Sequence, residues 1–213
     1  TSAYIKKRLD EMGIAWKDCG GPLPAAMTED YIAAGFPRME KETGVVATIG
    51  RGSPCFLLRA DIDALPVRED NDLDFKSTNG FGHMCGHDAH AAMLLGAAQI
   101  LKELEEQIPG TVKLMFQPGE ETGAGARLMV EDGLLNDPEP DAAFAIHVQP
   151  GDTTGHAGYA VGVNSASLDT FILKIKGKGG HSSQPQFCTD PLMVMNQAVS
   201  YTHLRAHETL SDL

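Results

Sequence analysis

The stretch TVKLMF (111–116), with AGARLMVE (124–131) and AAFAIHV (142–148) after it, decides the fold class of this chain. The first and third segments are apolar runs of strand length, and the segment between them is typical of a helix. A strand, a helix and a strand in this order indicate an α/β domain, in which a helix connects buried parallel strands. We therefore predict an α/β fold with a mixed, mainly parallel sheet and flanking helices.

The segments before residue 111 extend this pattern. Residues 88–107 are rich in Ala, Leu, Met and Glu, which predicts a long helix that is buried at its start and charged at its end. The β-rich runs 45–49 and 56–60 flank the turn-forming residues 50–54, so we expect them to be adjacent strands. We also expect a helix over residues 2–12 that ends at Gly13, and a short helix from Thr28 to Gly35.

The sequence changes in character after Gly162. Residues 168–176 alternate apolar and polar side chains, which predicts a long strand, and the glycine-rich loop 177–180 follows it. We therefore place a domain boundary near residue 162.

Composition argues against several classes of protein. The 213 residues are 42% hydrophobic and 22% charged, which is globular composition, and the formal net charge is −12. Such an acidic chain is poorly suited to bind nucleic acid phosphates, and no run approaches the ~18 apolar residues of a membrane span. We expect neither nucleic acid nor a membrane as a partner.

The cysteines and the start of the chain bear on its location. The four cysteines have no C-x-x-C spacing, which argues against a zinc ribbon or a disulfide framework and favours a reducing compartment. No signal peptide opens the sequence, which begins at Thr1 rather than Met. We expect a cytoplasmic protein.

Potential metal ligands follow predicted strands or precede the long predicted helix, where sites form in open α/β sheets. Singly, each has a plain structural explanation, such as an Asp that caps a turn or a buried histidine with a hydrogen-bond partner. Together, thiolate, imidazole and carboxylate groups at one sheet edge make a set suited to a divalent ion such as Zn²⁺ or Mn²⁺. The four segments are 61–63 (DID), 83–90 (HMCGHDAH), 117–121 (QPGEE) and His147.

The adjacent pair Glu120 and Glu121 indicates a hydrolytic mechanism. Hydrolysis with a metal needs one carboxylate to hold the ion and another to take a proton from water. An exposed acidic loop would be the better interpretation of such a pair alone, but this one follows a buried strand.

Other catalytic motifs are absent from the sequence. There is no G-x-S-x-G elbow, no G-x-G-x-x-G after a strand and no P-loop. His181, Ser182 and Ser183 do not make a triad, because sequence neighbours rarely face each other as nucleophile and base.

The sequence resembles the metallo-amidohydrolases typified by hippurate hydrolase and the plant auxin-conjugate hydrolases. Four ordered motifs carry the resemblance over about residues 44–192, and the helix at 1–12 is also similar to family sequence. Residues 20–43 stand as an insertion without an interpretation. The motifs are LRADIDALP (58–66), HMCGHDAH (83–90), QPGEE (117–121) and GGHSS (179–183).

The resemblance implies a role for each residue of the site. It implies two divalent ions, manganese or zinc before nickel or cobalt, with Cys85 as the bridging ligand and Glu120 as the catalytic base. Asp63 would orient the site, and His181 would reach from a smaller lid domain to polarise the substrate. His90 is expected beside the site rather than as a ligand. The metal ligands implied are Cys85, His87, Glu121 and His147.

The resemblance also implies a domain plan. Residues 1–162 would form the N-terminal part of a di-metal exopeptidase-like catalytic domain, and residues 163–198 the start of an α+β lid and dimerisation domain. Family members carry a further metal-ligating His after the lid, which this chain does not reach. The segment 199–213 departs from the lid pattern, so we expect a truncated chain with a non-native tail, in which His203 and His207 have no role.

The function implied is hydrolysis of the amide bond of N-acyl amino acids such as hippurate or N-acetyl derivatives, by a parent enzyme that forms a homodimer through its lid. A non-catalytic metal-binding relative of the same fold, or an inactive fragment, is the alternative. Retention of both Glu120 and Glu121 favours the enzyme.

Overall fold

The computed structural model describes residues 1–213 except 22–27, 30–31, 33–42, 152, 164–171 and 205–213, and the backbone alone of 201–204. The described chain forms two compact units, Thr1–Thr153 and Thr154–Leu213. The short helix expected from Thr28 to Gly35 lies largely outside the described residues. No described helix has the length and apolar character needed to span a membrane.

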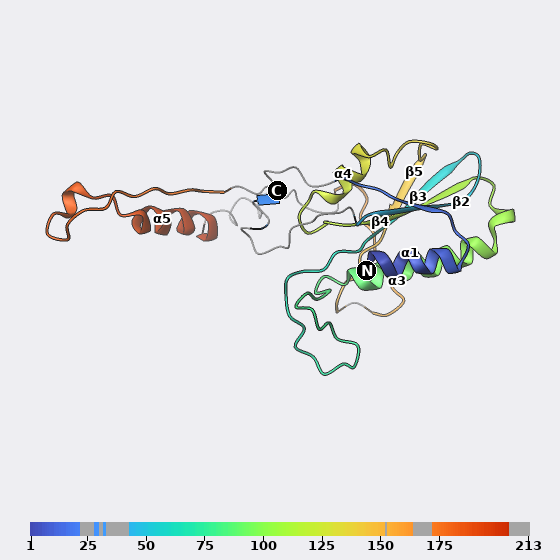
Figure 1. Cartoon of the computed structure of the whole chain (residues 1–213), viewed down its shortest axis with the longest axis horizontal. Coiled ribbons are helices and arrows are strands. Elements are labelled where there is room, and N and C mark those ends of the chain that lie inside the picture. Colours follow the sequence, from blue (N-terminus) through green and yellow to red (C-terminus); the bar gives the residue numbers. More distant parts are fainter. Residues whose placement is uncertain (22–27, 30–31, 33–42, 152, 164–171, 205–213) are drawn as a thin grey trace. The chain divides into compact units, whose positions relative to one another are not determined.

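The first unit is built on a five-stranded mixed sheet with the order β1-β2-β4-β3-β5 (Figure 1). β3 pairs in parallel with both β4 and β5, whereas β2 pairs antiparallel with β1 and β4. The expected mixed sheet is confirmed, and half of its pairings are parallel. The strands are β1 (Trp16–Asp18), β2 (Val45–Gly50), β3 (Cys55–Asp61), β4 (Thr111–Gln117) and β5 (Ala142–Ala145).

The expectation that β2 and β3 are neighbours is wrong, because β4 lies between them. The loop 51–54 arches over the start of β4, where Thr111 donates its N–H to the Pro54 carbonyl at 2.9 Å and its hydroxyl to the Gly52 carbonyl at 2.7 Å. A Cβ at Gly110 would lie 2.1 Å from the Pro54 carbonyl oxygen, so this crossing needs a glycine there.

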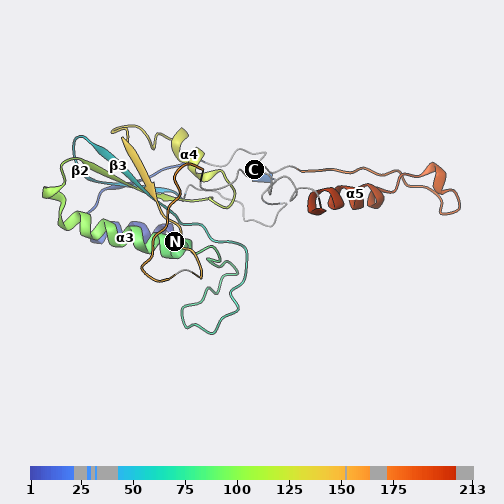
Figure 2. The same ribbon diagram turned by 180° about the vertical axis from the view of Figure 1, so that it is seen from behind.

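Two helices cover one face of the sheet and one short helix covers the other (Figures 1 and 2). α1 (Ser2–Glu11) and α3 (His87–Glu103) pack on the larger core, while α4 (Gly125–Glu131) buries Met129 against Val46, Leu57 and Met115. The long helix predicted over 88–107 is therefore α3 with the short 3₁₀ turn η1 (Glu105–Gln107).

α1 ends where the sequence predicts. Gly13 has a positive φ of 66°, and its N–H bonds the Asp10 carbonyl while the N–H of Ile14 bonds the Leu9 carbonyl. This pair of hydrogen bonds is the Schellman motif, and it places buried Leu9 and Ile14 together in the core.

The central and edge strands differ in burial. All seven residues of β4 are buried, including Lys113, which donates to the carbonyls of Leu134 and Asn136 at 2.9 and 2.5 Å. β5 is exposed along its length and ends at Ala145, before the predicted limit of Val148. The expected burial of β5 is wrong because β5 lies at the edge of the described sheet and no described helix packs closely on its faces.

The second unit contains η2 (Pro185–Phe187), α5 (Pro191–Leu204) and an isolated bridge between Lys178 and Thr189. Of the strand predicted over 168–176, residues 168–171 lie outside the described part, and residues 172–176 form no strand. Residues 172–176 pair with no other described segment, and an alternating pattern forms a strand only when a neighbouring strand pairs with it. The domain boundary predicted near 162 stays a prediction.

Candidate metal centre

Three strand ends and the start of α3 meet at one edge of the sheet. β3, β4 and β5 run in parallel, so the segments that follow them leave the sheet on the same side. Asp61 is the last residue of β3 and Asp63 follows it, Glu120 and Glu121 follow β4, and His147 follows β5, while His87 begins α3 and Cys85 precedes it. The structure thus brings together six of the seven predicted site residues.

Cys85 and His147 face each other, with Sγ 3.4 Å from Nε2. The Nδ1 of His147 is 2.7 Å from the carbonyl of Val148, which fixes the proton on Nδ1 and leaves Nε2 as a lone-pair donor. Ligand atoms of Cys85, His87 and His147 all lie within 4.8 Å of one another. This spacing suits three ligands of one ion.

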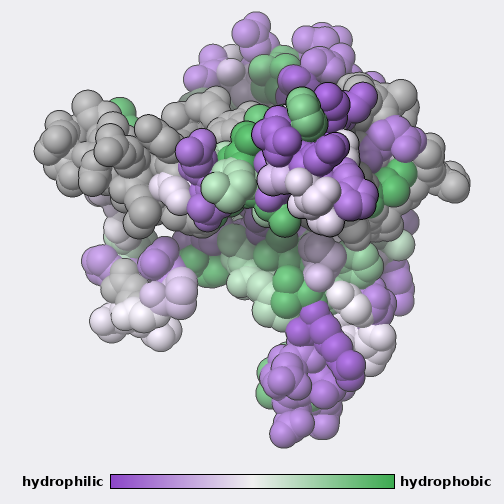
Figure 3. Space-filling model, turned by 90° about the vertical axis from the view of Figure 1, so that its left-hand side faces the viewer, coloured by the Kyte–Doolittle hydropathy of each residue, from purple (hydrophilic) through white to green (hydrophobic). Residues whose placement is uncertain are grey.

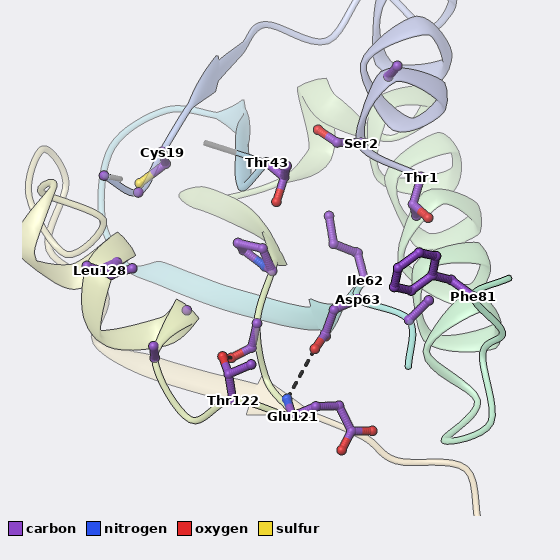
Figure 4. A pocket seen from close by; sticks show the side chains of 18 of the residues that line it. Thr1, Ser2, Cys19, Thr43, Ile62, Asp63, Phe81, Glu121, Thr122 and Leu128 are labelled. Atoms are coloured by element: carbon purple, nitrogen blue, oxygen red, sulfur yellow. Dashed lines mark hydrogen bonds between the residues drawn. The ribbon is translucent and has the colours of Figure 1, made fainter. Parts of the chain in front are cut away.

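His87 is the buried centre of the cluster, with 1% of its side chain exposed. Its Nδ1 lies 3.1 Å from Asp63 Oδ1, and the other oxygen of Asp63 accepts the Glu121 N–H at 3.1 Å (Figure 4). Its Nε2 lies 3.8 Å from Glu120 Oε2 and 4.0 Å from Glu121 Oε1. Asp63 therefore orients both the ring of His87 and the backbone at Glu121.

The donor set fits a bound cation. His87 Nε2 and Glu121 Oε1 are buried and have no hydrogen-bond partner among the described residues, although such atoms cost free energy when left unpaired. Burial, followed by the nearby carboxylates of Glu121 and Glu120, raises the pKa of the Cys85 thiol. A cation held between these groups would satisfy the unpaired atoms and favour the thiolate.

The two glutamates differ in exposure. The side chain of Glu120 is 41% exposed and that of Glu121 is 24% exposed. The loop that carries them closes through the Gly125 N–H, which bonds the Gly119 carbonyl at 3.1 Å. A Cβ at Gly125 would lie 1.5 Å from the Pro118 carbonyl oxygen, so the loop depends on this glycine.

Asp61 lies in one of the segments of potential metal ligands, but the family resemblance implied no role for it. It is fully buried, and Arg59 Nη1 lies 2.9 Å from its Oδ2, while Arg59 Nε donates to Gln117 Oε1 at 2.8 Å. Burial raises the pKa of Asp61, but its bond to His90 and the charge of Arg59 together outweigh burial and lower that pKa. Two opposite charges two residues apart in an apolar strand were the signal that could have identified this pair.

His90 lies beside the ligands, and neither ring nitrogen is free to bind an ion. Nδ1 is 2.5 Å from Asp61 Oδ1, and Nε2 accepts the Val148 N–H at 2.9 Å.

His181 belongs to the second unit. It is exposed, and its Nδ1 lies 2.8 Å from the hydroxyl and 3.2 Å from the backbone nitrogen of Ser183. Its predicted role at the metal site stays a prediction.

A cavity of about 540 Å³ borders the cluster at Asp63 and Glu121 (Figure 4). Ile62, Phe81 and Leu128 give it a largely apolar lining, and among the described residues only Cys19 adds a further ligating group. Nearby, the loop closed by the bridge between Leu65 and Gly82 projects from the unit (Figure 1), and its surface is largely hydrophilic (Figure 3).

Known proteins match both the sequence and the fold. Peptidase family M20/M25/M40 matches residues 57–210. The chain is 40% identical over 211 residues to IAA-amino acid hydrolase ILR1-like 5 of Arabidopsis thaliana, covering 98% of this chain and 43% of that protein. It is 40% identical over 202 residues to N-acetyl-L-cysteine deacetylase of Bacillus subtilis, with 93% and 43% covered.

A solved structure agrees with these relatives. A dinuclear metal binding peptidase of the M20 family from Bacillus subtilis superimposes with a TM-score of 0.57 at 36% identity, covering 70% of this chain and 37% of that one. The chain spans less than half the length of the curated relatives that it matches.

Proposed function

The chain belongs to peptidase family M20/M25/M40, and from this premise we propose that its protein hydrolyses the amide bond of N-acyl amino acids at a centre of two divalent metal ions. Cys85, His87, Glu121 and His147 would hold the ions, with manganese or zinc preferred to nickel or cobalt. Such ions polarise the substrate carbonyl and lower the pKa of water. The names of two relatives, an IAA-amino acid hydrolase and an N-acetyl-L-cysteine deacetylase, support this substrate class.

One observation carries the proposal: two adjacent carboxylates lie beside the same buried imidazole in different environments. Glu121 has a buried, unpaired oxygen, which suits an ion ligand. Glu120 is more exposed and its Oε2 lies 3.8 Å from His87 Nε2, so it can reach a water molecule near the ions and accept its proton. The same carboxyl group would then return the proton to the leaving amine.

Other residues prepare the site for that proton transfer. Asp63 fixes the ring of His87, as carboxylates commonly do for ligating histidines. His181 would donate a hydrogen bond to the substrate oxygen, and the second unit would also form a homodimer contact. The four cysteines form no disulfide, which supports a cytoplasmic location.

The test is Glu120→Gln in the longest product of the gene that carries this sequence. The amide keeps the shape of the side chain but cannot accept a proton, so turnover of hippurate and of N-acetylcysteine should fall by about 100-fold or more. Metal content, measured by elemental analysis, should stay unchanged. Glu131→Gln, at an exposed position on α4, is the matched control and should retain full turnover. Near-normal turnover in Glu120→Gln would refute this assignment.

A further inference from the structure

His90 has a defined protonation pattern that follows from its two partners. The backbone N–H of Val148 is a donor, so Nε2, which lies 2.9 Å from it, must be the acceptor. A neutral ring then carries its proton on Nδ1 and donates it to Asp61 at 2.5 Å. Both side chains are almost fully buried, so no water competes for these bonds.

The segment that His90 holds has no strand to support it. β5 ends at Ala145, so residues 146–148 have lost the ladder of hydrogen bonds that fixes the backbone before them. Two contacts fix Val148 instead. Its N–H bonds His90, and its side chain packs on the start of α3, where a Cβ at Gly86 would lie 2.4 Å from Val148 Cγ2.

The position of Val148 determines the position of the His147 ring. The Val148 carbonyl accepts the proton of His147 Nδ1 at 2.7 Å, and the His90 and His147 rings pack edge to face with their centroids 4.5 Å apart. The ring is thereby aimed with Nε2 toward Cys85 Sγ. His90 thus contacts both the peptide and the ring that present this ligand atom.

We propose that Asp61 and His90 form a positioning pair that directs the His147 imidazole to the metal site. Arg59 keeps Asp61 in place at the end of β3, and His90 transmits that position from β3 to the end of β5. His90 is a positioning residue and not a ligand, because both of its nitrogens are engaged. The inference rests on the proposed function, since it takes His147 as a ligand.

Two substitutions separate the two hydrogen bonds of His90. In His90→Asn the amide nitrogen can replace Nδ1 as donor to Asp61, but nothing accepts the Val148 N–H. In His90→Gln the longer side chain can place its oxygen near the former Nε2 and accept that N–H. Gln99→Asn on the exposed side of α3 is the control for an amide change on the same helix.

The measurement is a titration with Co²⁺ of the longest product of the gene that carries this sequence, followed by visible and near-ultraviolet absorption. His90→Asn should weaken binding about 10- to 100-fold, the range known for partners of metal ligands. His90→Gln should weaken it less, because the Val148 N–H keeps an acceptor while Asp61 loses its donor, and Gln99→Asn should bind as the unaltered chain does. At saturation, the spectrum of His90→Asn should move toward that of His147→Ala. A role in folding alone would lower the unfolding temperature of the metal-free chain without moving that spectrum.

The double variant His90→Asn with His147→Ala should bind no more weakly than His147→Ala alone, because no ligand remains to be positioned. If His90→Asn proves unfolded by circular dichroism, Asp61→Asn tests the same arrangement. The amide introduced by Asp61→Asn can donate to His90 Nδ1, which favours the His90 tautomer with its proton on Nε2. That proton would face the Val148 N–H, so the hydrogen bond between them would be lost. Co²⁺ binding should therefore weaken again.

The outcomes separate this inference from the proposed function. Unchanged Co²⁺ binding in folded His90→Asn, with weakened binding in His147→Ala, would overturn the positioning pair alone. Unchanged binding in His147→Ala, or no binding by the unaltered chain, would overturn the proposed metal centre.

Discussion

The ends of β4 and β5 both supply groups to the candidate metal centre, but they are built in different ways. β4 is buried along its whole length, and the loop after it is closed by backbone contacts between Gly119 and Gly125. β5 is exposed and short, and the segment after it is held by the side chain of His90. One side of the site is therefore fixed by the fold itself, and the other by a few replaceable side-chain contacts.

The largest expected difference between the two strands is in stability. Leu114→Ala on β4 should lower the free energy of unfolding by about 2–5 kcal/mol, because it opens a cavity in a fully buried position. Phe144→Ala on β5 should cost less than about 1 kcal/mol, since that ring is 63% exposed. Urea unfolding followed by fluorescence of Trp16, the single tryptophan, measures both. Equal losses would show that β5 is as well packed as β4.

Removing metal-binding side chains tests whether the residues near Cys85 and those after β5 bind the same ions. Cys85→Ala and His147→Ala should each weaken binding of Mn²⁺ or Zn²⁺ by roughly 100-fold, because each removes a donor atom that no neighbour replaces. This is the upper end of the loss seen when a residue that supports a metal ligand is removed. Equilibrium dialysis with elemental analysis measures the loss. Cys188→Ala, in the second unit, is the control and should bind metal as the unaltered chain does. Unchanged stoichiometry in both site variants would contradict the centre.

The smallest of these effects concerns the loop after β4. Gly125→Ala should lower the free energy of unfolding by about 1–3 kcal/mol, because its new methyl group would overlap the Pro118 carbonyl. Gly96→Ala on α3 is the matched change in open space, and there the better helix propensity of alanine should raise stability by up to about 1 kcal/mol. Thermal unfolding of the two variants gives the comparison. A stable Gly125→Ala would mean that the loop adapts more easily than its backbone contacts indicate.

Local patterns were sufficient to predict most elements of the first unit. Apolar runs and helix signals located β2, β3, β4, α1, α3 and α4, because each of these buries a regular face. They missed β1, because a strand of three largely exposed residues is too short to show an alternation of apolar and polar side chains. They also misplaced β3 beside β2, since strand order depends on long-range pairing that no local window contains.

The candidate site was predictable where residue type determines chemistry. Residue type pointed to the segments 61–63, 83–90 and 117–121 and to His147, because few other residues bind divalent ions. The family resemblance implied the ligand set Cys85, His87, Glu121 and His147 within them, which stays a prediction. The partnership of Asp61 with His90 could not be predicted, because it joins residues 29 positions apart through a geometry that emerges only when α3 packs on β3. Residues 172–176, the described part of the strand predicted over 168–176, form no strand for a similar reason, since alternation makes a strand only when a partner pairs with it.

The arch of residues 51–54 over the start of β4 constrains the order in which the first unit can assemble. β2 and β3 are close in sequence, yet the slot between them is filled by residues 111–117, which leave the ribosome some fifty residues later. β2 and β3 cannot pair as a local hairpin, because that pairing would exclude β4 from its position between them. Closing this sheet therefore requires non-local contacts, which slows folding, and a nascent chain that ends before Gln117 would expose two unpaired apolar edges to aggregation.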